Sequence, residues 1–340
     1  MVSRDKKRKR LMHVAELAGV SLSTVDRVLN ERGSVSDTKR RKVLMAAKSL
    51  GINRTLPSPI HGLLRIDLII VDSPSDHFRR LNAAFSRQAD MLKSRLVLQR
   101  YIWNERSPEE LLHYITAPRT GRQGLIVVAH DTPDIRRALE AQIDAGIPVI
   151  LLTSSLSGLT GATYIGVDNY TAGRSAGSLL TKWLPAKQAK VLLITNSLLY
   201  EAHRQRVQGF LDVMRARAPE LKVSQALECH DDDALNGLAV RKALQKDPEL
   251  AAIYTTGSGS AGIHRVLCET GARPVWIGHE ASQQHSDMLK EGVLSLVLDQ
   301  DPEGQAEAAI QHLLYANGDL DVPPKTSPQL RIVIDENPIS

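Results

Sequence analysis

The sequence has few cysteines and no long apolar run. Its 340 residues include only two cysteines, Cys229 and Cys268, which are too few for a disulfide framework and suit a reducing compartment. No stretch approaches the roughly 20 apolar residues that a membrane helix needs, and no apolar segment follows the basic residues 4–10 as an export signal would require. We therefore expect a cytoplasmic protein with no membrane partner.

Low-complexity tracts are also missing. The hydrophobic fraction of 42% and the charged fraction of 24% are those of an ordinary globular protein. A chain of 340 residues exceeds what one hydrophobic core usually serves. We therefore expect a folded chain with one small domain and one larger domain that can itself be divided.

Positive charge is concentrated at the N terminus. Residues 1–54 hold 14 Lys and Arg against 5 Asp and Glu, whereas the rest of the chain has a net charge of −4, so the overall +5 comes wholly from the first segment. Such a concentration favours a polyanion, because neutralising phosphates releases condensed counterions. A solvated basic tail would have the same charge, so the residue pattern must decide between the two.

The first fifty residues have the periodicity of three short helices. Apolar residues recur at helical spacing over residues 11–18, and Gly19 then interrupts them. Ser21 can cap a second helix over residues 22–30, and a third helix with a basic outer face follows over residues 36–50. Two short helices joined by a turn with glycine form a helix-turn-helix, whose second helix enters the major groove of DNA. The alternative is a three-helix bundle that binds nothing, which leaves the charge unexplained.

Residues 14–30 closely resemble, as one ungapped stretch, the headpiece of the lactose-repressor (LacI/GalR) family of bacterial transcriptional regulators. The resemblance implies that residues 1–54 are a DNA-binding headpiece and that Leu22, Ser23 and Arg27 face the bases of a double-stranded operator. It implies that Ser21, Thr24 and Asn30 contact phosphate or hold the headpiece together. It also implies a repressor that binds a near-palindromic site as a homodimer.

The chain departs from the family pattern at two places. Asp26 stands where the family usually has serine, and a carboxylate near phosphates repels them unless it pairs, for which Arg27 and Arg32 are candidates. The linker, residues 55–62, contains Pro57 and Pro59, whereas the family has a short helix there that inserts a leucine into the minor groove. We expect this linker to be a stiff, extended spacer.

Beyond Leu63, apolar β-type runs alternate with helix-type segments, which predicts parallel sheets covered by helices. The length suits two such lobes. This part resembles, more loosely, the periplasmic sugar-binding-protein fold of the same regulators, which implies one lobe of about 63–187 and 299–325 and a second of about 188–298 and 326–334. The predicted runs are 64–71, 125–129, 149–152, 164–167, 191–195, 252–255, 275–278, 296–298 and 331–334.

Ligands of such folds bind beyond the carboxyl ends of the strands. The resemblance therefore implies a sugar, polyol or sugar phosphate as effector, bound between the lobes. Phe78 would stack on a sugar face unless it packs in the core, and Arg204 would reach ligand hydroxyls unless it is a plain surface arginine. The other candidates are Asp72, Ser75, Asp168 (alternatively a helix cap), Thr256, Glu280 and Gln300.

A rival signal lies at residues 257–262, which read G-x-G-x-x-G after a strand, with Glu280 at a plausible distance for a ribose contact. In regulators of the family that the chain resembles, the same turn lines the effector crevice, and Ser258 and Ser260 could bind an anionic or phosphorylated effector there. Alone, the motif would indicate an NAD-type enzyme. An enzyme of this type leaves the headpiece unexplained. A third possibility is a sugar-binding protein with an incidental basic extension. Such a protein would need an export signal, which we do not find. The run 229–233 has metal-ligand residue types that are adjacent rather than convergent, and no catalytic motif is visible. We expect no enzyme, cofactor or metal.

Overall fold

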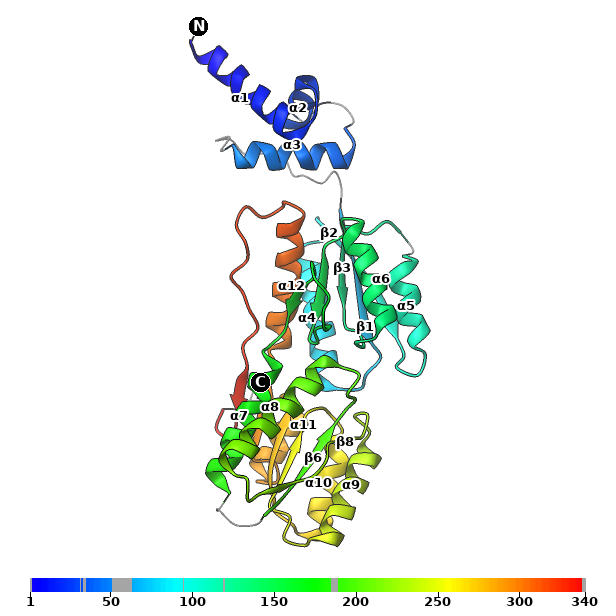
Figure 1. The fold of residues 1–340 in the computed structure, drawn as a ribbon, viewed down its shortest axis with the longest axis vertical. Coiled ribbons are helices and arrows are strands. Elements are labelled where there is room, and N and C mark those ends of the chain that lie inside the picture. The colour runs from blue at the N-terminus through cyan, green and yellow to red at the C-terminus, as the bar shows by residue number, and fades with distance from the viewer. Residues whose placement is uncertain are drawn as a thin grey trace.

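The computed structural model describes residues 2–30, 32, 35–50, 63–93, 95–118, 120–184 and 189–337. A small helical domain is followed by two α/β lobes along the long axis of the molecule (Figure 1). This confirms the predicted fold class. The predicted linker at 55–62 and the crossing expected at Lys187 lie outside the described residues.

Three helices form the headpiece, the name used here for the helical part of residues 1–54. They bury an apolar core in which Val14, Val25 and Val28 have no exposed surface. The left-handed conformation of Gly19, with φ of 62°, lets the chain turn between the first two helices. The helices are α1 (Val2–Ala18), α2 (Leu22–Leu29) and α3 (Asp37–Ser49), so α1 begins well before the periodic segment that predicted it.

Lobe 1 has a five-stranded parallel sheet in the order β2-β1-β3-β4-β5 within the described ranges. Alternate residues of β1 point to opposite faces: Ile66 and Leu68 pack toward α4 and α12, whereas Ile69 packs toward α5 and α6. The elements are β1 (Leu64–Val71), α4 (Asp76–Met91), β2 (Leu96–Trp103), α5 (Pro108–Thr116), β3 (Gly124–Val127), α6 (Pro133–Asp144), β4 (Val149–Leu152), β5 (Thr163–Ile165) and α12 (Pro302–Ala316).

Lobe 2 is built on a second sheet, whose main path is β12-β11-β10-β9-β6-β7, with β8 also paired to β6. Its strands are parallel except β12, which runs antiparallel at the edge. One face packs on α7 and α8, and the other packs on α9, α10 and α11. The elements are α7 (Asn169–Trp183), β6 (Lys190–Thr195), α8 (Glu201–Arg217), β7 (Lys222–Val223), β8 (Leu227–Glu228), α9 (Asp233–Lys246), β9 (Ala252–Thr255), α10 (Ser260–Thr270), β10 (Val275–His279), α11 (Gln283–Lys290), β11 (Leu296–Asp299) and β12 (Arg331–Val333).

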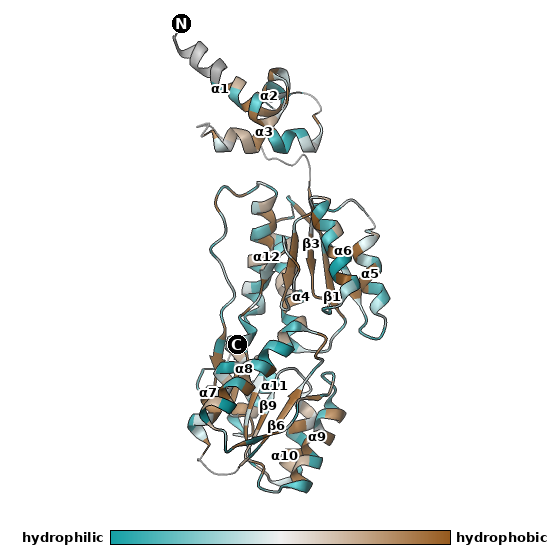
Figure 2. Ribbon diagram, in the orientation of Figure 1, coloured by the Kyte–Doolittle hydropathy of each residue, from teal (hydrophilic) through white to brown (hydrophobic). Residues whose placement is uncertain are grey.

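Hydropathy follows this layering. The central strands of both lobes are strongly hydrophobic, and the helices that cover them have mixed or hydrophilic outer faces (Figure 2). No helix in the described ranges is long and apolar enough to cross a membrane.

The first crossing between the lobes lies earlier than predicted. We expected lobe 1 to continue to about residue 187, but α7 packs on α8 of lobe 2. A Cβ atom on Gly173 would lie 2.0 Å from the backbone oxygen of Arg206, so these two helices touch backbone to backbone. The chain therefore crosses at residues 166–168, returns to lobe 1 after Asp299, and crosses again before β12.

Candidate functional site

The second helix of the headpiece divides cleanly into two faces. Val25, Val28 and Leu29 are buried, whereas Ser23 and Arg27 are exposed on the opposite side. All six residues predicted to touch DNA lie in or directly beside this helix, and Leu22 and Thr24 are half-buried. Ser21 caps the helix, because its Oγ accepts a hydrogen bond from the Thr24 backbone N–H at 3.2 Å.

Asp26 pairs with neither of the arginines proposed for it. Asn30 donates from Nδ2 to Asp26 Oδ1 at 2.7 Å, and Arg27 instead donates from Nε to the Ser23 carbonyl at 3.3 Å. The partner of the carboxylate is thus an uncharged amide, which leaves its negative charge on the exposed side of the helix. One amide hydrogen of Asn30 is used in this bond and is therefore not available to a DNA phosphate.

A cavity of about 50 Å³ lies between the two lobes, at the carboxyl ends of their parallel strands. Strand ends of lobe 1 contribute Ser75, Glu105 and Thr153, together with His77 and Phe78 from the start of α4. Lobe 2 contributes Asn196, His203, Arg206, Asp231, Thr256 and Glu280, among others. Its volume is below the roughly 300 Å³ at which ligand pockets usually begin. A ligand of sugar size therefore requires the lining side chains to rearrange.

Arg206 is the buried cation of this cavity, with only 2% of its surface exposed. It donates from Nε to Asn169 Oδ1 at 2.9 Å, from Nη1 to the Thr256 carbonyl at 2.7 Å, and from Nη2 to Gln300 Oε1. These three acceptors come from α7 and from the ends of β9 and β11. The guanidinium therefore fixes several strand ends of lobe 2 relative to one another.

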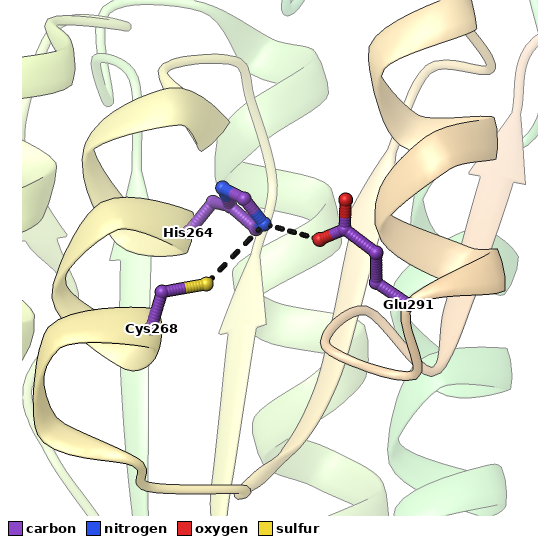
Figure 3. Close-up of side chains that lie close together, drawn as sticks. All are labelled: His264, Cys268 and Glu291. Carbon is purple, nitrogen blue, oxygen red and sulfur yellow. Dashed lines mark hydrogen bonds and ion pairs between the residues drawn. The ribbon is translucent and has the colours of Figure 1, made fainter.

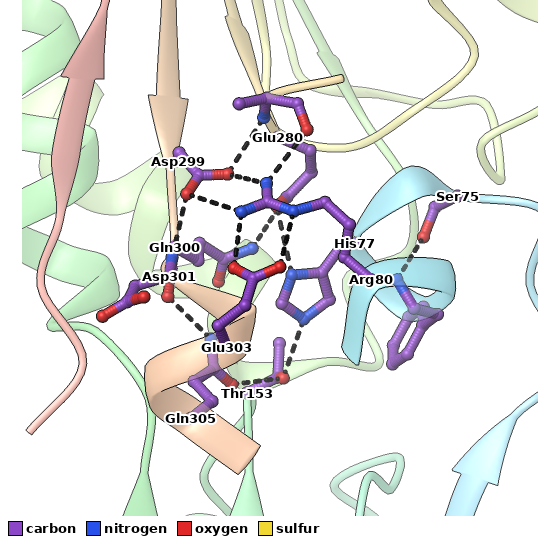
Figure 4. Close-up of polar contacts among 12 residues, drawn as sticks. Ser75, His77, Arg80, Thr153, Glu280, Asp299, Gln300, Asp301, Glu303 and Gln305 are labelled. Carbon is purple, nitrogen blue, oxygen red and sulfur yellow. Dashed lines mark hydrogen bonds and ion pairs between the residues drawn. The ribbon is translucent and has the colours of Figure 1, made fainter. Parts of the chain in front are cut away.

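A chain of polar contacts continues from lobe 2 into lobe 1 (Figure 4). Gln300 donates from Nε2 to one oxygen of Glu280, whose other oxygen lies 3.1 Å from His77 Nδ1. His77 Nε2 is 3.0 Å from Thr153 Oγ1, which donates to Gln305 at 2.8 Å. The pair of His77 and Glu280 thus ties the two lobes at the cavity wall.

The charges of the cavity are set by burial and by their neighbours. Burial alone would raise the pKa of Glu280, but the nearby His77 and Arg206 outweigh it and lower the pKa to about 2. Burial, helped by repulsion from Arg206, lowers the pKa of His203 to about 3, so its imidazole is neutral. Burial raises the pKa of Asp231 to about 6 despite its hydrogen bonds from Ser258 and Asn196. The ring of His203 and the carboxyl of Asp231 thus offer two different kinds of polar contact.

Asn196 has an unused acceptor at the cavity. Its Nδ2 donates to Asp231 Oδ2 at 2.7 Å, whereas its Oδ1 is buried and has no hydrogen-bond partner among the described residues. A buried acceptor without a partner costs roughly 1–3 kcal/mol. A hydroxyl of a bound ligand would remove that cost.

Backbone strain also gathers at this cavity. Thr153, Asp231 and Glu280 have positive φ values of 63°, 57° and 68°, a region that residues with side chains rarely adopt. Each such residue costs of the order of 1–3 kcal/mol, and such residues cluster at ligand sites. The strain and the unused acceptor are two independent features of the kind that ligand sites often have.

The structure brings together five of the eight residues predicted for the effector. Phe78 lines the cavity and also packs against both apolar clusters of lobe 1. Ser75 both lines the cavity and caps α4, since its Oγ accepts from the Phe78 N–H at 3.4 Å. The five are Ser75, Phe78, Thr256, Glu280 and Gln300.

The other three predicted residues lie outside the cavity lining. Asp72 is exposed after β1, and Asp168 caps α7 by accepting from the Thr171 N–H at 2.9 Å. Arg204 forms an ion pair with Asp131 of lobe 1 and with Glu201. Its place is taken by Arg206, because two steps along an α-helix turn a side chain by roughly 200°. Residues two apart on a helix point in nearly opposite directions, so only one of Arg204 and Arg206 can face the cavity.

Sequence reasoning missed further cavity residues, namely His77, Asn196, His203, Arg206 and Asp231. Asp231 belongs to the run 229–233, whose adjacent metal-ligand residue types predicted no site, and its neighbour Asp232 caps the start of α9. Position after a strand was the available signal for Asn196, which follows β6 directly.

The G-x-G-x-x-G turn is explained by packing. A Cβ on Gly257 would lie 2.3 Å from Asp231 Oδ1, and one on Gly262 would lie 1.6 Å from the Asp233 carbonyl oxygen. The Ser258 N–H, which could have bound a phosphate, already donates to Asp231 at 2.7 Å. The two glycines allow the Asp231 carboxylate and the start of α9 to pack closely against this turn. Close packing therefore accounts for the motif without a dinucleotide.

Two family models match the chain. Residues 10–53 match the bacterial regulatory proteins of the lacI family, and residues 69–319 match the periplasmic binding protein domain. The chain thus joins a helix-turn-helix headpiece of the lacI family of bacterial regulatory proteins to a periplasmic binding protein domain. Its headpiece is therefore a DNA-binding domain, and the family is one of regulators rather than enzymes.

Individual relatives agree with this assignment. The chain is 25% identical over 276 residues to the ribose operon repressor of Bacillus subtilis (strain 168), which covers 79% of this chain and 74% of that protein. The fold is shared with GanP, a glucose-galactose binding protein from Geobacillus stearothermophilus, with a TM-score of 0.72, 20% identity and coverage of 82% of this chain and 99% of that one. It is also shared with a solute binding protein from Burkholderia graminis C4D1M in complex with D-arabinose, with a TM-score of 0.73, 20% identity and coverage of 82% and 98%.

Proposed function

We propose that this regulator is a repressor whose inter-lobe cavity binds a neutral sugar or polyol, and whose affinity for its operator changes with that binding. The observation that supports it most is the unused acceptor of Asn196 in a polar cavity built by both lobes. Phe78 adds an aromatic face of the kind that sugar rings stack on. The names of the relatives, a ribose operon repressor and proteins that bind glucose, galactose or arabinose, point to the same ligand class.

Charge favours a neutral ligand over a sugar phosphate. Glu105, Asp231 and Glu280 line the cavity, and Arg206 already donates to three protein acceptors. The backbone N–H of Ser258 is likewise occupied by Asp231. An added phosphate would meet these carboxylates, while Arg206 and the Ser258 N–H are already engaged by protein acceptors. We therefore narrow the effector to uncharged polyhydroxy compounds.

Closure of the lobes offers the route by which binding reaches the DNA. Tyr200 of lobe 2 donates to Glu105 of lobe 1 at 2.5 Å, and Arg204 pairs with Asp131 across the same gap. A ligand that touches both lobes binds the closed arrangement better and shifts the population toward it by its differential affinity. The linker at 55–62 would pass this change to the headpieces.

A homodimer on a near-palindromic site completes the proposal. One headpiece reads only a short half-site, and two copies double the contacts with the operator. Sedimentation of the full chain with and without operator should show a dimer at micromolar concentration. A monomer under both conditions would remove this part of the proposal.

A thermal-shift screen of sugars, polyols and their phosphates tests the ligand class. A ligand present at 100 times its Kd adds about 2.7 kcal/mol to the stability of the folded state. We expect a neutral sugar or polyol to raise the Tm, and the Asn196→Ala variant to lose most of that rise. Asn317→Ala is the matched control, since Asn317 is a buried asparagine that caps α12 away from the cavity.

The screen has two results that would contradict the proposal. A Tm rise only with phosphorylated compounds would reverse the argument from charge. An equal rise in the wild type and Asn196→Ala would place the ligand elsewhere.

A further inference from the structure

Three side chains with metal-binding atoms meet on the outside of lobe 2 (Figure 3). His264 and Cys268 lie one turn apart on α10, and Glu291 caps the C terminus of α11. His264 Nε2 is 2.7 Å from Glu291 Oε2 and 3.5 Å from Cys268 Sγ. None of the three lines the inter-lobe cavity.

We propose that His264, Cys268 and Glu291 bind a zinc ion. Imidazole nitrogen, thiolate sulfur and carboxylate oxygen are the three protein ligand types of Zn²⁺. Bond lengths of about 2.0–2.1 Å to nitrogen and about 2.3 Å to sulfur place these two atoms about 3.5 Å apart in a tetrahedral site. The observed separation of His264 Nε2 and Cys268 Sγ is 3.5 Å.

Only Glu291 has to move. A tetrahedral site would separate its oxygen from the imidazole nitrogen by about 3.4 Å, whereas the present hydrogen-bonded separation is 2.7 Å. The side chain of Glu291 is 53% exposed, so a small rotation into the solvent side is open to it. The carboxylate would exchange its hydrogen bond with the ring for a bond to the metal.

The backbone holds the three positions firmly. Residues four apart on a helix share one face, so α10 presents His264 and Cys268 together. Ile263 and Leu267 anchor that helix in the core of lobe 2 with no exposed surface. The end of α11 is fixed by the bond from the Glu291 N–H to the Asp287 carbonyl at 2.9 Å.

A surface ion pair explains only part of this arrangement. The pair of His264 and Glu291 needs no thiol, yet Cys268 directs its sulfur at the same imidazole nitrogen. Cys268 is also an exposed cysteine, whereas Cys229 is buried in the core of lobe 2. An exposed free thiol is open to oxidation and other reactions. A role as a metal ligand would explain why Cys268 stands at this exposed position. Three protein ligands leave the fourth zinc position for water or another group.

Protection of the thiol gives the most specific test. The full-length protein is alkylated with iodoacetamide with and without ZnCl₂, and the two cysteine peptides are quantified by mass spectrometry. We expect zinc to slow alkylation of Cys268 at least tenfold in the wild type and to have no such effect in His264→Ala. The buried Cys229 is the internal control for unfolding.

Direct binding should follow the same residues. We expect His264→Ala and Cys268→Ser each to weaken Zn²⁺ binding by at least about tenfold, since even changes beside metal ligands cost 10–100-fold. His113→Ala, at an exposed histidine of α5 in lobe 1, should bind zinc like the wild type. Bound Co²⁺ should show thiolate charge-transfer absorption that is absent in Cys268→Ser. Equal Zn²⁺ affinity in Cys268→Ser and the wild type, or unprotected Cys268, would overturn the site.

Discussion

The headpiece and the inter-lobe cavity place an arginine in opposite environments. Arg27 is exposed on α2, and its described hydrogen bond is to the carbonyl of its own helix at Ser23. Arg206 is 2% exposed and donates to three acceptors from other elements. The first is free to meet a partner as large as DNA, whereas the second organises the wall of a cavity. Their removal should therefore affect different properties of the protein.

The largest expected effect is on stability. Arg206→Ala leaves three buried acceptors without a partner, at about 1–3 kcal/mol each, so we expect a loss of at least about 3 kcal/mol in the unfolding free energy of the lobes. Arg27→Ala, at an exposed site, should stay within about 0.5 kcal/mol of the wild type. Chemical denaturation of both variants checks this. Similar losses in the two proteins would remove the contrast between the arginines.

The reverse contrast is expected on DNA. Arg27→Ala should weaken binding to the cognate operator by about 1–3 kcal/mol if Arg27 reads a base edge. An operator selected from a random DNA pool and a scrambled duplex serve as the two substrates. An equal loss on both substrates would make Arg27 a phosphate contact rather than a base contact.

The same contrast explains what the sequence predicts well. The residues predicted to contact DNA lie in or beside one short helix, so periodicity, charge and the family resemblance indicate them together. The cavity collects residues from the ends of nine strands and from two helices, α4 and α8, that are distant in the sequence. Position after a strand identified Thr256, Glu280 and Gln300, but it does not reveal that Asp231 folds back onto Ser258.

Two errors in the fold have similar causes. The crossing between the lobes was predicted after α7, because no sequence signal shows that Gly173 approaches Arg206 of lobe 2. Strand β2 was not predicted at all. It is an edge strand of lobe 1 whose middle residues Gln99 and Arg100 are polar and half-buried, so its apolar pattern is interrupted. Packing across long sequence separations decides both features.

A smaller effect is expected from pH. Burial raises the pKa of Asp231 in the folded protein to about 6 from 3.8, so the folded state holds a proton over this range that the unfolded state has lost. The contribution of this group to stability is fully present below about pH 4 and is lost as the pH rises through about 6. Asp231→Asn lacks this loss, so its Tm relative to the wild type should increase between about pH 4 and 7. A constant Tm difference across this range would contradict the raised pKa.

The smallest effect is expected at Asp26. Asp26→Asn removes a negative charge from the helix predicted to face DNA and keeps an acceptor for the amide of Asn30. We expect a gain of less than about 1 kcal/mol in affinity for cognate and scrambled DNA alike, and a smaller gain at high salt. Filter-binding or anisotropy titrations at two salt concentrations measure it. Weaker binding by Asp26→Asn would show that the carboxylate positions a DNA contact.

The coupling of the cavity to the headpiece is tested most directly by operator titrations with and without the sugar or polyol that raises the Tm. The wild type should show a ligand-dependent change in operator affinity. Asn196→Ala should lose that change while its ligand-free affinity equals that of the wild type, because Asn196 lies in the cavity and outside the headpiece. A full ligand-dependent change in Asn196→Ala, or none in a wild type that demonstrably binds the ligand, would contradict the account.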